Sequence, residues 1–343
     1  MPCFLIMLLF HNGADEEDGL LQQEPDWRLI VPGKRSFVRQ GGDFVLEFVR
    51  VNQQAFDLRW TDVSSPREFI SAGHTSARGS SVKIRVLGCH GSDQLLDCHG
   101  QMLQCRPCAF LINDTVLLDA GTVGSRLTLP EQMKISHVLL SHLHFDHIKD
   151  LPTLADNLVG ESGTSLVVAA IPEVLGGLRA HIFNSSVYPD FFRLPDAGRS
   201  VLIPHPLQID REWTISGLRI VPIRVNHLVP TVGFLISDER ATVLYSADTY
   251  QTDDIWHAAS SMPNLKAAFI EVSYPNAHAT LAKSAKHLTP ELLGHEFKKI
   301  GRPDLPVYVY HVKPRFQSVI ETELRQLPIP HITVLEENLE LVF

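Results

Sequence analysis

From Val82 onward, short apolar runs alternate with Gly, Asp and Pro, and each run has the length of a single β-strand. Stretches with helical spacing lie between these runs, and one begins at Thr289, which can cap a helix whose first turn holds Pro290. Strands interleaved with helices predict a layered α/β domain, with sheets inside and helices outside. The predicted strands are 82–87, 108–112, 116–119, 137–141, 166–169, 218–225, 232–236, 243–246, 267–272 and 307–310, and the predicted helices are 148–159, 172–183, 289–299 and 316–327.

The first 79 residues follow a different pattern. They include a strand-like alternation at 44–51, and the stretch 71–81, rich in Ser, Gly and Ala, predicts a linker. They carry no cluster of chemically useful side chains, so we expect an N-terminal accessory region at 1–79 and a main domain at 80–343. The apolar run 2–10 is about half as long as a membrane span and precedes four acidic residues, which favours a short buried strand.

Composition narrows the class of protein. With 343 residues, 44% hydrophobic and 20% charged, the chain is typical of a soluble globular protein, and we expect it in the cytoplasm. A formal charge of −9 argues against a broad grip on nucleic acid, which requires clustered Lys and Arg. Five cysteines in a chain of this size do not indicate a disulfide scaffold. Cys98, Cys105 and Cys108 lie close together in sequence, and we interpret them as reduced thiols, with a third metal site or a redox role as the alternative.

Among seventeen histidines, one cluster stands out. The apolar run that begins at Val138 ends in His142-Leu-His144-Phe-Asp146-His147, which places four metal-ligand side chains within six residues. On an extended backbone the first three would point the same way, and a helical turn beginning at residue 148 would bring His147 to the same point. The alternative is a run of solvated loop histidines, which would place all four at the end of a buried strand by chance.

Three later strands also end in a ligand type. Predicted strands 218–225, 243–246 and 307–310 are followed by His227, Asp248 and His311. A single histidine at a strand end is more often structural than functional. Together with the 142–147 cluster, the three residues form a set that favours a site built from several strand ends.

This set resembles the H-x-H-x-D-H…H…D…H order of the metallo-β-lactamase superfamily, over about residues 82–343. The resemblance implies an αββα sandwich of two internal mixed sheets flanked by helices, with two divalent ions at one edge, Zn²⁺ first and Mn²⁺ or Fe²⁺ as alternatives. Asp119, in Leu117-Leu-Asp-Ala-Gly121, matches a D-x-G turn that orients a metal ligand by a hydrogen bond. The resemblance assigns the first ion to His142, His144 and His227, the second to Asp146, His147 and His311, and the bridge to Asp248. This His/Asp ligand set contains no cysteine.

The C-terminal half resembles bacterial class II 3′,5′-cyclic-nucleotide phosphodiesterases, in which a Glu-x-Ser segment and a His-Leu pair precede the last histidine ligand. Here these are Glu271-Val-Ser273 and His287-Leu288. The resemblance implies hydrolysis of a cyclic nucleotide, cyclic AMP first, to the 5′-monophosphate by a hydroxide shared between the ions. Asp146 then acts at the metals, His287 is the candidate general acid and Glu271 its orienting partner. Phe145 stands where that family has Leu, which leaves the substrate less certain than the reaction.

Three rivals remain open: a tRNA 3′-processing endonuclease, a thioesterase or lactonase of the same fold, and a metal-bound sensor that docks a partner. The first needs a basic arm, and no Gly/Lys-rich insertion lies between Ile148 and His227. A sensor has no need of all seven ligands. We therefore expect a small-molecule substrate, with neither extended nucleic acid nor membrane as partner, and leave a homodimer open.

Overall fold

The computed structural model describes residues 82–96, 102–160, 165–195 and 199–343. The predicted accessory region, its strand 44–51, the linker, the apolar run 2–10 and Cys98 lie outside the described residues. Within the described part of the chain, no helix has the length and apolar character needed to cross a lipid bilayer.

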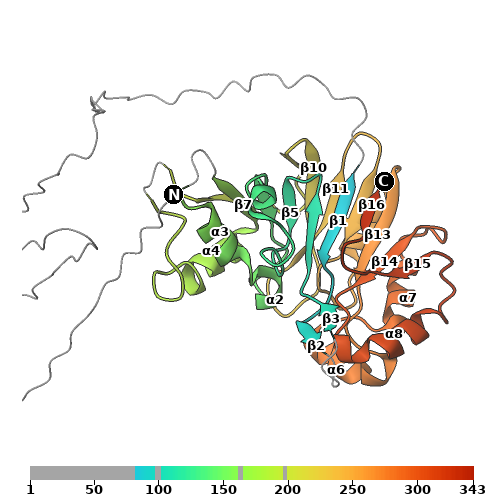
Figure 1. Ribbon diagram of the computed structural model, residues 1–343. Helices are drawn as coiled ribbons and strands as arrows, with labels where there is room; N and C mark the ends of the chain where they lie inside the picture. Colours follow the sequence, from blue (N-terminus) through green and yellow to red (C-terminus); the bar gives the residue numbers. More distant parts are fainter. Residues whose placement is uncertain (1–81, 97–101, 161–164, 196–198) are drawn as a thin grey trace, which may run out of the picture. The chain divides into compact units, whose positions relative to one another are not determined.

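Two seven-stranded sheets form the centre of the fold (Figure 1). In the first sheet, the strands from β5 to β8 are parallel, whereas β16, β1, β4 and β5 pair antiparallel. In spatial order the strands are β16 (Glu340–Val342), β1 (Lys83–Gly88), β4 (Ala109–Ile112), β5 (Val116–Leu118), β6 (His137–Leu139), β7 (Leu166–Ala170) and β8 (Leu202–Pro206).

The second sheet repeats this mixed design. Strands β9 to β12 pair antiparallel, and β12 to β15 are parallel. Strand β10 therefore runs in the same direction as β12, because two antiparallel steps separate them. In spatial order the strands are β15 (Ile332–Val334), β14 (Val307–Tyr310), β13 (Leu265–Glu271), β12 (Thr242–Tyr245), β11 (Val232–Ser237), β10 (Leu218–Arg224) and β9 (Trp213–Ile215), and the small hairpin β2 (Gln94–Leu96) and β3 (Met102–Cys105) lies apart from both sheets.

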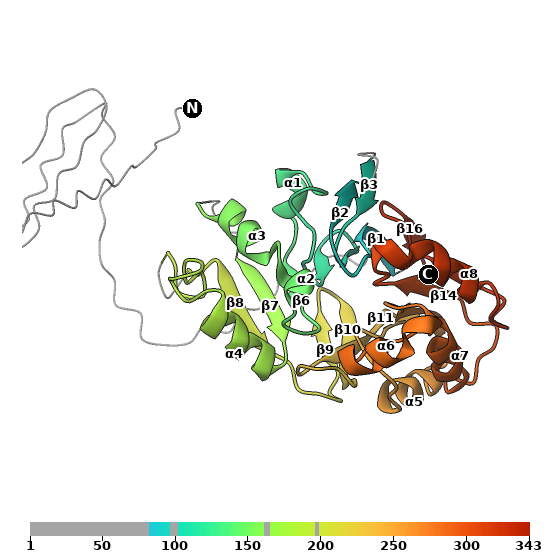
Figure 2. The same cartoon turned by 90° about the horizontal axis from the view of Figure 1, so that it is seen from below.

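Helices flank the two sheets on their outer faces (Figure 2). Helices α3 and α4 accompany the first sheet, and α5, α7 and α8 accompany the second, where they enclose a second apolar cluster that includes Trp256, Leu293 and Phe297. The described helices are α1 (Leu129–Gln132), α2 (Phe145–Ile148), α3 (Leu151–Leu158), α4 (Pro172–His181), α5 (Asp254–Ser260), α6 (Ala279–Ala285), α7 (Pro290–Lys298) and α8 (Gln317–Leu324), with single turns at η1 (Asn276–His278) and η2 (Pro314–Phe316).

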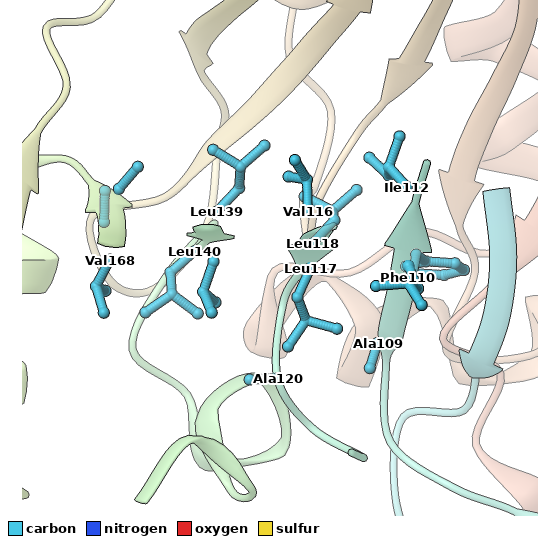
Figure 3. Packing of buried hydrophobic residues seen from close by; sticks show 14 of the residues in the cluster. Ala109, Phe110, Ile112, Val116, Leu117, Leu118, Ala120, Leu139, Leu140 and Val168 are labelled. Carbon is cyan, nitrogen blue, oxygen red and sulfur yellow. The ribbon is translucent and has the colours of Figure 1, made fainter. Parts of the chain in front are cut away.

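The main core lies between the two sheets. Figure 3 shows its apolar side chains on the strands of the first sheet, with Phe110 of β4 among them. The ring of Phe110 contacts those of Tyr245, Phe269 and Tyr310 from the second sheet, with ring centroids 5.6–6.0 Å apart. Both faces of the central strands are buried, which explains their continuous apolar sequences.

The predicted sandwich of two mixed sheets flanked by helices is confirmed, and each of the ten predicted strands is present with its ends within two residues. The sequence did not predict β2, β3, β8, β9, β15 and β16. Each of these is short or lies at a sheet edge, and β8 contains Pro204 and Pro206, which edge strands tolerate. The helix predicted at 148–159 is wrong at its start, because a first helical turn already begins at Phe145 and a second begins at Leu151.

Candidate metal centre

The carboxyl ends of parallel strands meet at one rim of each sheet, and the ligand-type residues follow these ends. Strand β6 precedes the 142–147 cluster, β12 precedes Asp248 and β14 precedes His311. Because β10 has the direction of β12, His227 also lies at this rim. The topology thus explains how residues distant in sequence come together.

One group at the rim joins three histidines and an aspartate. Ligand atoms of His142, His144, His227 and Asp248 lie within 4.8 Å of one another. His144 Nδ1 is 3.0 Å from His227 Nε2, and His142 Nε2 is 3.6 Å from Asp248 Oδ2. This arrangement is suited to one divalent cation.

A second group shares the same aspartate. Oδ2 of Asp248 is 3.4 Å from His147 Nε2 and 3.3 Å from His311 Nε2, which is itself 3.2 Å from Asp146 Oδ2. The carboxylate of Asp248 therefore lies between both groups, as a bridging ligand would. The structure brings together all seven residues that the sequence singled out as ligands.

The local fold of the 142–147 segment differs from the expectation. His144 has extended angles and is the N-cap of α2, so Asp146 already lies in the helical turn together with His147. The side chains reach the rim because the chain changes from strand to helix within the motif, and not after it. Phe145 is left 62% exposed beside the site.

Three residues at this rim adopt left-handed backbone angles. Asp119, Ala247 and His311 have φ values of 54°, 52° and 65°. Such angles are costly for residues with a Cβ and occur where the surrounding structure imposes them, often at functional sites. Here they turn the chain sharply as it leaves β5, β12 and β14.

Hydrogen bonds fix which nitrogen of His142 and of His227 faces the centre. Nδ1 of His142 bonds the Ser141 hydroxyl at 2.9 Å, and Nδ1 of His227 donates to the Lys286 carbonyl at 3.0 Å. With Nδ1 engaged, Nε2 of each ring is directed to the site, as in metal-binding histidines generally.

Asp119 holds the second group from behind. Its Oδ2 accepts from His147 Nδ1 at 2.7 Å and from the hydroxyls of Ser141 and Tyr245 at 2.8 Å each. The Ser141 backbone N–H donates to Oδ1. The predicted role of Asp119 in orienting a ligand agrees with this geometry, and Ser141 and Tyr245 extend it.

Glu271 links the candidate general acid to a candidate ligand. Its Oε1 accepts from His287 Nδ1 at 2.8 Å and from the Thr249 N–H at 3.0 Å, and its Oε2 accepts from the Ser273 hydroxyl at 3.1 Å. Ser273 in turn bonds His311 Nδ1 at 2.8 Å. Glu271 therefore supports both His287 and His311. Ser273 was not singled out from the sequence as a site residue, although it lies in the Glu-x-Ser segment.

Charge and burial suit the site to cations. Burial lowers the pKa of His227 to about 4 and also lowers that of His142, so both rings are neutral and offer a lone pair. Burial alone would lower the pKa of His147 too, but Asp248 and Asp119 outweigh it and hold that pKa above its ordinary value. Burial would raise the pKa of Asp248, yet His311 and His147 hold it well below its usual range. The carboxylates thus favour positive charge here.

Buried polar atoms without a partner test the fit directly. Nε2 of His142, Nε2 of His147 and Oδ1 of Asp248 are buried and lack a hydrogen bond within the described residues. An unpaired buried polar atom is costly, and the two imidazole nitrogens lie 3.6 and 3.4 Å from the other oxygen of Asp248. Divalent cations would satisfy all three, so the residues fit the metals that the fold implies.

The comparisons with known proteins agree with this geometry. The sequence model of the beta-lactamase superfamily domain matches residues 114–308, more than half of the chain. The chain belongs to this superfamily. Its fold is that of solved metallo-β-lactamase-type structures: YhfI from Bacillus subtilis (TM-score 0.61, 18% identity) and yeast PDE1 (TM-score 0.63, 16% identity). Each alignment covers 77% of this chain, and 100% and 99% of the respective structure.

Two curated proteins are similar to this chain in sequence. Ribonuclease Z of Metallosphaera sedula is 23% identical over 145 residues, which is 41% of this chain and 45% of that protein. The uncharacterized protein Rv1339 of Mycobacterium tuberculosis is 30% identical over 191 residues, which is 51% of this chain and 63% of that protein. The chain therefore spans less than two thirds of the length of either relative.

Proposed function

We propose that this superfamily member is a metal-dependent phosphodiesterase that hydrolyses a 3′,5′-cyclic nucleotide, cyclic AMP first, to the 5′-monophosphate. The observation that carries the proposal is the buried pair His287–Glu271, which lies beside the seven ligand-type residues. A site for hydrolysis needs water activation on one side of the reacting atom and a proton donor on the other. Two divalent ions, Zn²⁺ first, supply water of lowered pKa and polarise the phosphate when bound.

Two features of His287 support its assignment as the donor of that proton. Its Nδ1 is committed to Glu271, so Nε2 is the free nitrogen, and its ring stacks on that of His311 with centroids 5.2 Å apart. Burial alone would lower the pKa of His287, but the Glu271 carboxylate outweighs it and holds that pKa above its ordinary value. The Glu271 carboxylate thus favours the protonated form of His287, and we assign this residue the protonation of the departing ribose oxygen.

The surroundings suit a nucleotide. The Lys313 ammonium lies 5.9 Å from the ring centre of Tyr274, which is itself 5.9 Å from the His287 ring. Phe145 and Leu228, next in sequence to two ligand-type histidines, are 62% and 59% exposed. A cation beside the proton donor favours a phosphate, and exposed apolar side chains favour contact with a base.

Cleavage of tRNA 3′ ends is the second candidate, because one curated relative is named Ribonuclease Z. The formal charge of −9 favours the small substrate, since binding a long polyanion requires an extended basic surface. A panel of cyclic AMP, precursor tRNA, an acyl thioester and a homoserine lactone distinguishes the phosphodiesterase from its rivals. Turnover of none of these by the zinc-loaded chain would favour the sensor.

The decisive experiment is His287→Ala, with His295→Ala as a matched control because His295 is an exposed histidine on α7. We expect His287→Ala to lower kcat for cyclic AMP by roughly 10²–10⁴-fold, the usual contribution of a general acid. Metal content by mass spectrometry should stay near that of the wild type, and the control should keep its activity. A loss of metal in His287→Ala would make His287 a ligand and contradict the assignment.

A further inference from the structure

Cys108 lies at the metal centre although the sequence pattern did not include it among the ligands. It is the residue before β4 and is fully buried. Its Sγ lies with the ligand nitrogens of His147 and His311, all three atoms within 4.8 Å of one another. These are the two histidines of the second group, the one that also contains Asp146.

The backbone holds Cys108 against both of these histidines. Its carbonyl accepts the Gly121 N–H at 3.0 Å, which ties it to the turn containing Asp119, the partner of His147. Its thiol is 3.6 Å from the His90 carbonyl, and His90 forms a bridge with Val312, next to His311. The sulfur is therefore placed by the segments that place the two nitrogens.

Nothing else in the described structure explains this thiol fully. A contact of 3.6 Å from a thiol to a carbonyl is a weak hydrogen bond. His147, also fully buried, directs an unpartnered Nε2 into the same group. A buried sulfur next to an unpaired imidazole nitrogen is the pattern of a metal ligand pair.

We infer that Cys108 supplies a sulfur ligand to the second metal ion, together with His147 and His311. This inference deepens the proposed metal centre and rests on it. In a tetrahedral zinc site, with sulfur at about 2.3 Å and nitrogen at about 2.0 Å from the ion, the two ligand atoms lie roughly 3.5 Å apart. The observed separations, at most 4.8 Å, would therefore shrink by up to roughly 1.3 Å as the ion binds. As the sulfur–metal bond forms, the thiol proton leaves to the medium.

The two ions then differ in character. The first group offers only nitrogen and oxygen, whereas the second adds a soft sulfur, which favours Zn²⁺, Co²⁺ or Cd²⁺ over Mn²⁺ or Mg²⁺. The second site would thus select a thiophilic metal and be less Lewis acidic than the first. This replaces the cysteine-free ligand set expected from the sequence.

Cobalt substitution of the full chain tests the inference, because a Co²⁺–thiolate bond adds a charge-transfer absorption in the near ultraviolet. Visible d–d absorption reports bound Co²⁺ whatever its ligands are. We compare the wild type with Cys108→Ser and Cys108→Ala. The matched control is Cys89→Ser, since Cys89 is equally buried but its thiol donates to the Leu335 carbonyl at 3.3 Å.

The expected result is a near-ultraviolet band in the wild type and in Cys89→Ser that is lost in both Cys108 variants, while visible absorption from the first site remains. The ratio of the Mn²⁺ Kd to the Zn²⁺ Kd should also fall at least about 10-fold in the Cys108 variants. Losing a single group that supports a metal typically weakens metal binding by about this factor. Two results would overturn the role of Cys108 but leave the metal centre intact. One is visible absorption without the near-ultraviolet band in the wild type, and the other is a near-ultraviolet band that survives in both Cys108 variants. Absence of any cobalt absorption overturns the metal centre with it, and cyclic AMP turnover, assayed separately, decides the proposed function.

Discussion

Metal binding should raise the stability of this chain by an amount that follows from the unpaired atoms at the site. Three buried polar atoms, on His142, His147 and Asp248, have no hydrogen-bond partner among the residues that the structure describes. Each such atom costs about 1–3 kcal/mol, so the metal-free fold carries roughly 3–9 kcal/mol that ligation removes. When the free zinc concentration is 1,000-fold above Kd, binding at one site adds about 4 kcal/mol to the free energy of unfolding. For a domain of this size that corresponds to roughly 8–16 °C in Tm.

The assay is thermal unfolding followed by fluorescence, first after EDTA treatment and then across a zinc titration. Asp248→Ala should lose most of the rise in Tm, because it removes the carboxylate shared by both groups, whereas His295→Ala should keep it. If the Tm of the wild type changes by less than about one degree between EDTA and saturating zinc, the reasoning is refuted. Cations would then not stabilise the fold through these buried atoms.

Three further predictions follow from single contacts. Gly121→Ala places a Cβ against the Asp146 carbonyl, so we expect the free energy of unfolding to fall by about 1–3 kcal/mol and zinc binding to weaken. Urea unfolding and zinc titration measure the two effects, and unchanged values would contradict the close approach. Tyr245→Phe removes one donor to Asp119 and should cost about 1 kcal/mol in the same unfolding assay. Hydrogen bonds from Thr128 lower the pKa of Glu131 to about 2, so its stabilisation is present above pH 4.5 and lost as pH falls towards 2. The stability gap between wild type and Glu131→Gln, about 0.5 kcal/mol, should close over that range and not widen.

The apolar runs predicted a layered α/β domain, and the ligand types at strand ends predicted a shared site, because both signals can be recognised in short segments of the chain. The two-sheet sandwich was what the family resemblance implied. The central strands are buried on both faces, so each shows an uninterrupted apolar run that can be recognised without its neighbours. Edge strands such as β16 owe their form to pairing with β1, a contact that a three-residue segment does not reveal.

Residues that act by proximity were harder to predict. Cys108 and Ser273 acquire their contacts with the ligand histidines from segments 38 or more residues away, since His147 follows Cys108 by 39 positions and His311 follows Ser273 by 38. The spacing of each to its sequence neighbours gives no sign of the histidine that it contacts. The start of α2 was misplaced for a related reason, because Phe145 is exposed and does not extend the apolar pattern of a helix.

The direction of the strands also gives the sandwich two different rims: one carries the residues of the metal centre, and the opposite one carries none of them. The tight turns at Asn113–Asp114, at Ser216–Gly217 and around Arg240 join antiparallel neighbours at the ends away from the histidines, and Asp114, Gly217 and Arg240 are exposed there. A fluorophore, an affinity tag or a tethering cysteine placed in these turns would report on the chain or immobilise it without touching its chemistry. The loops that follow β5, β6, β10, β12 and β14 at the opposite rim offer no such freedom, because each one leads directly into a side chain of the site.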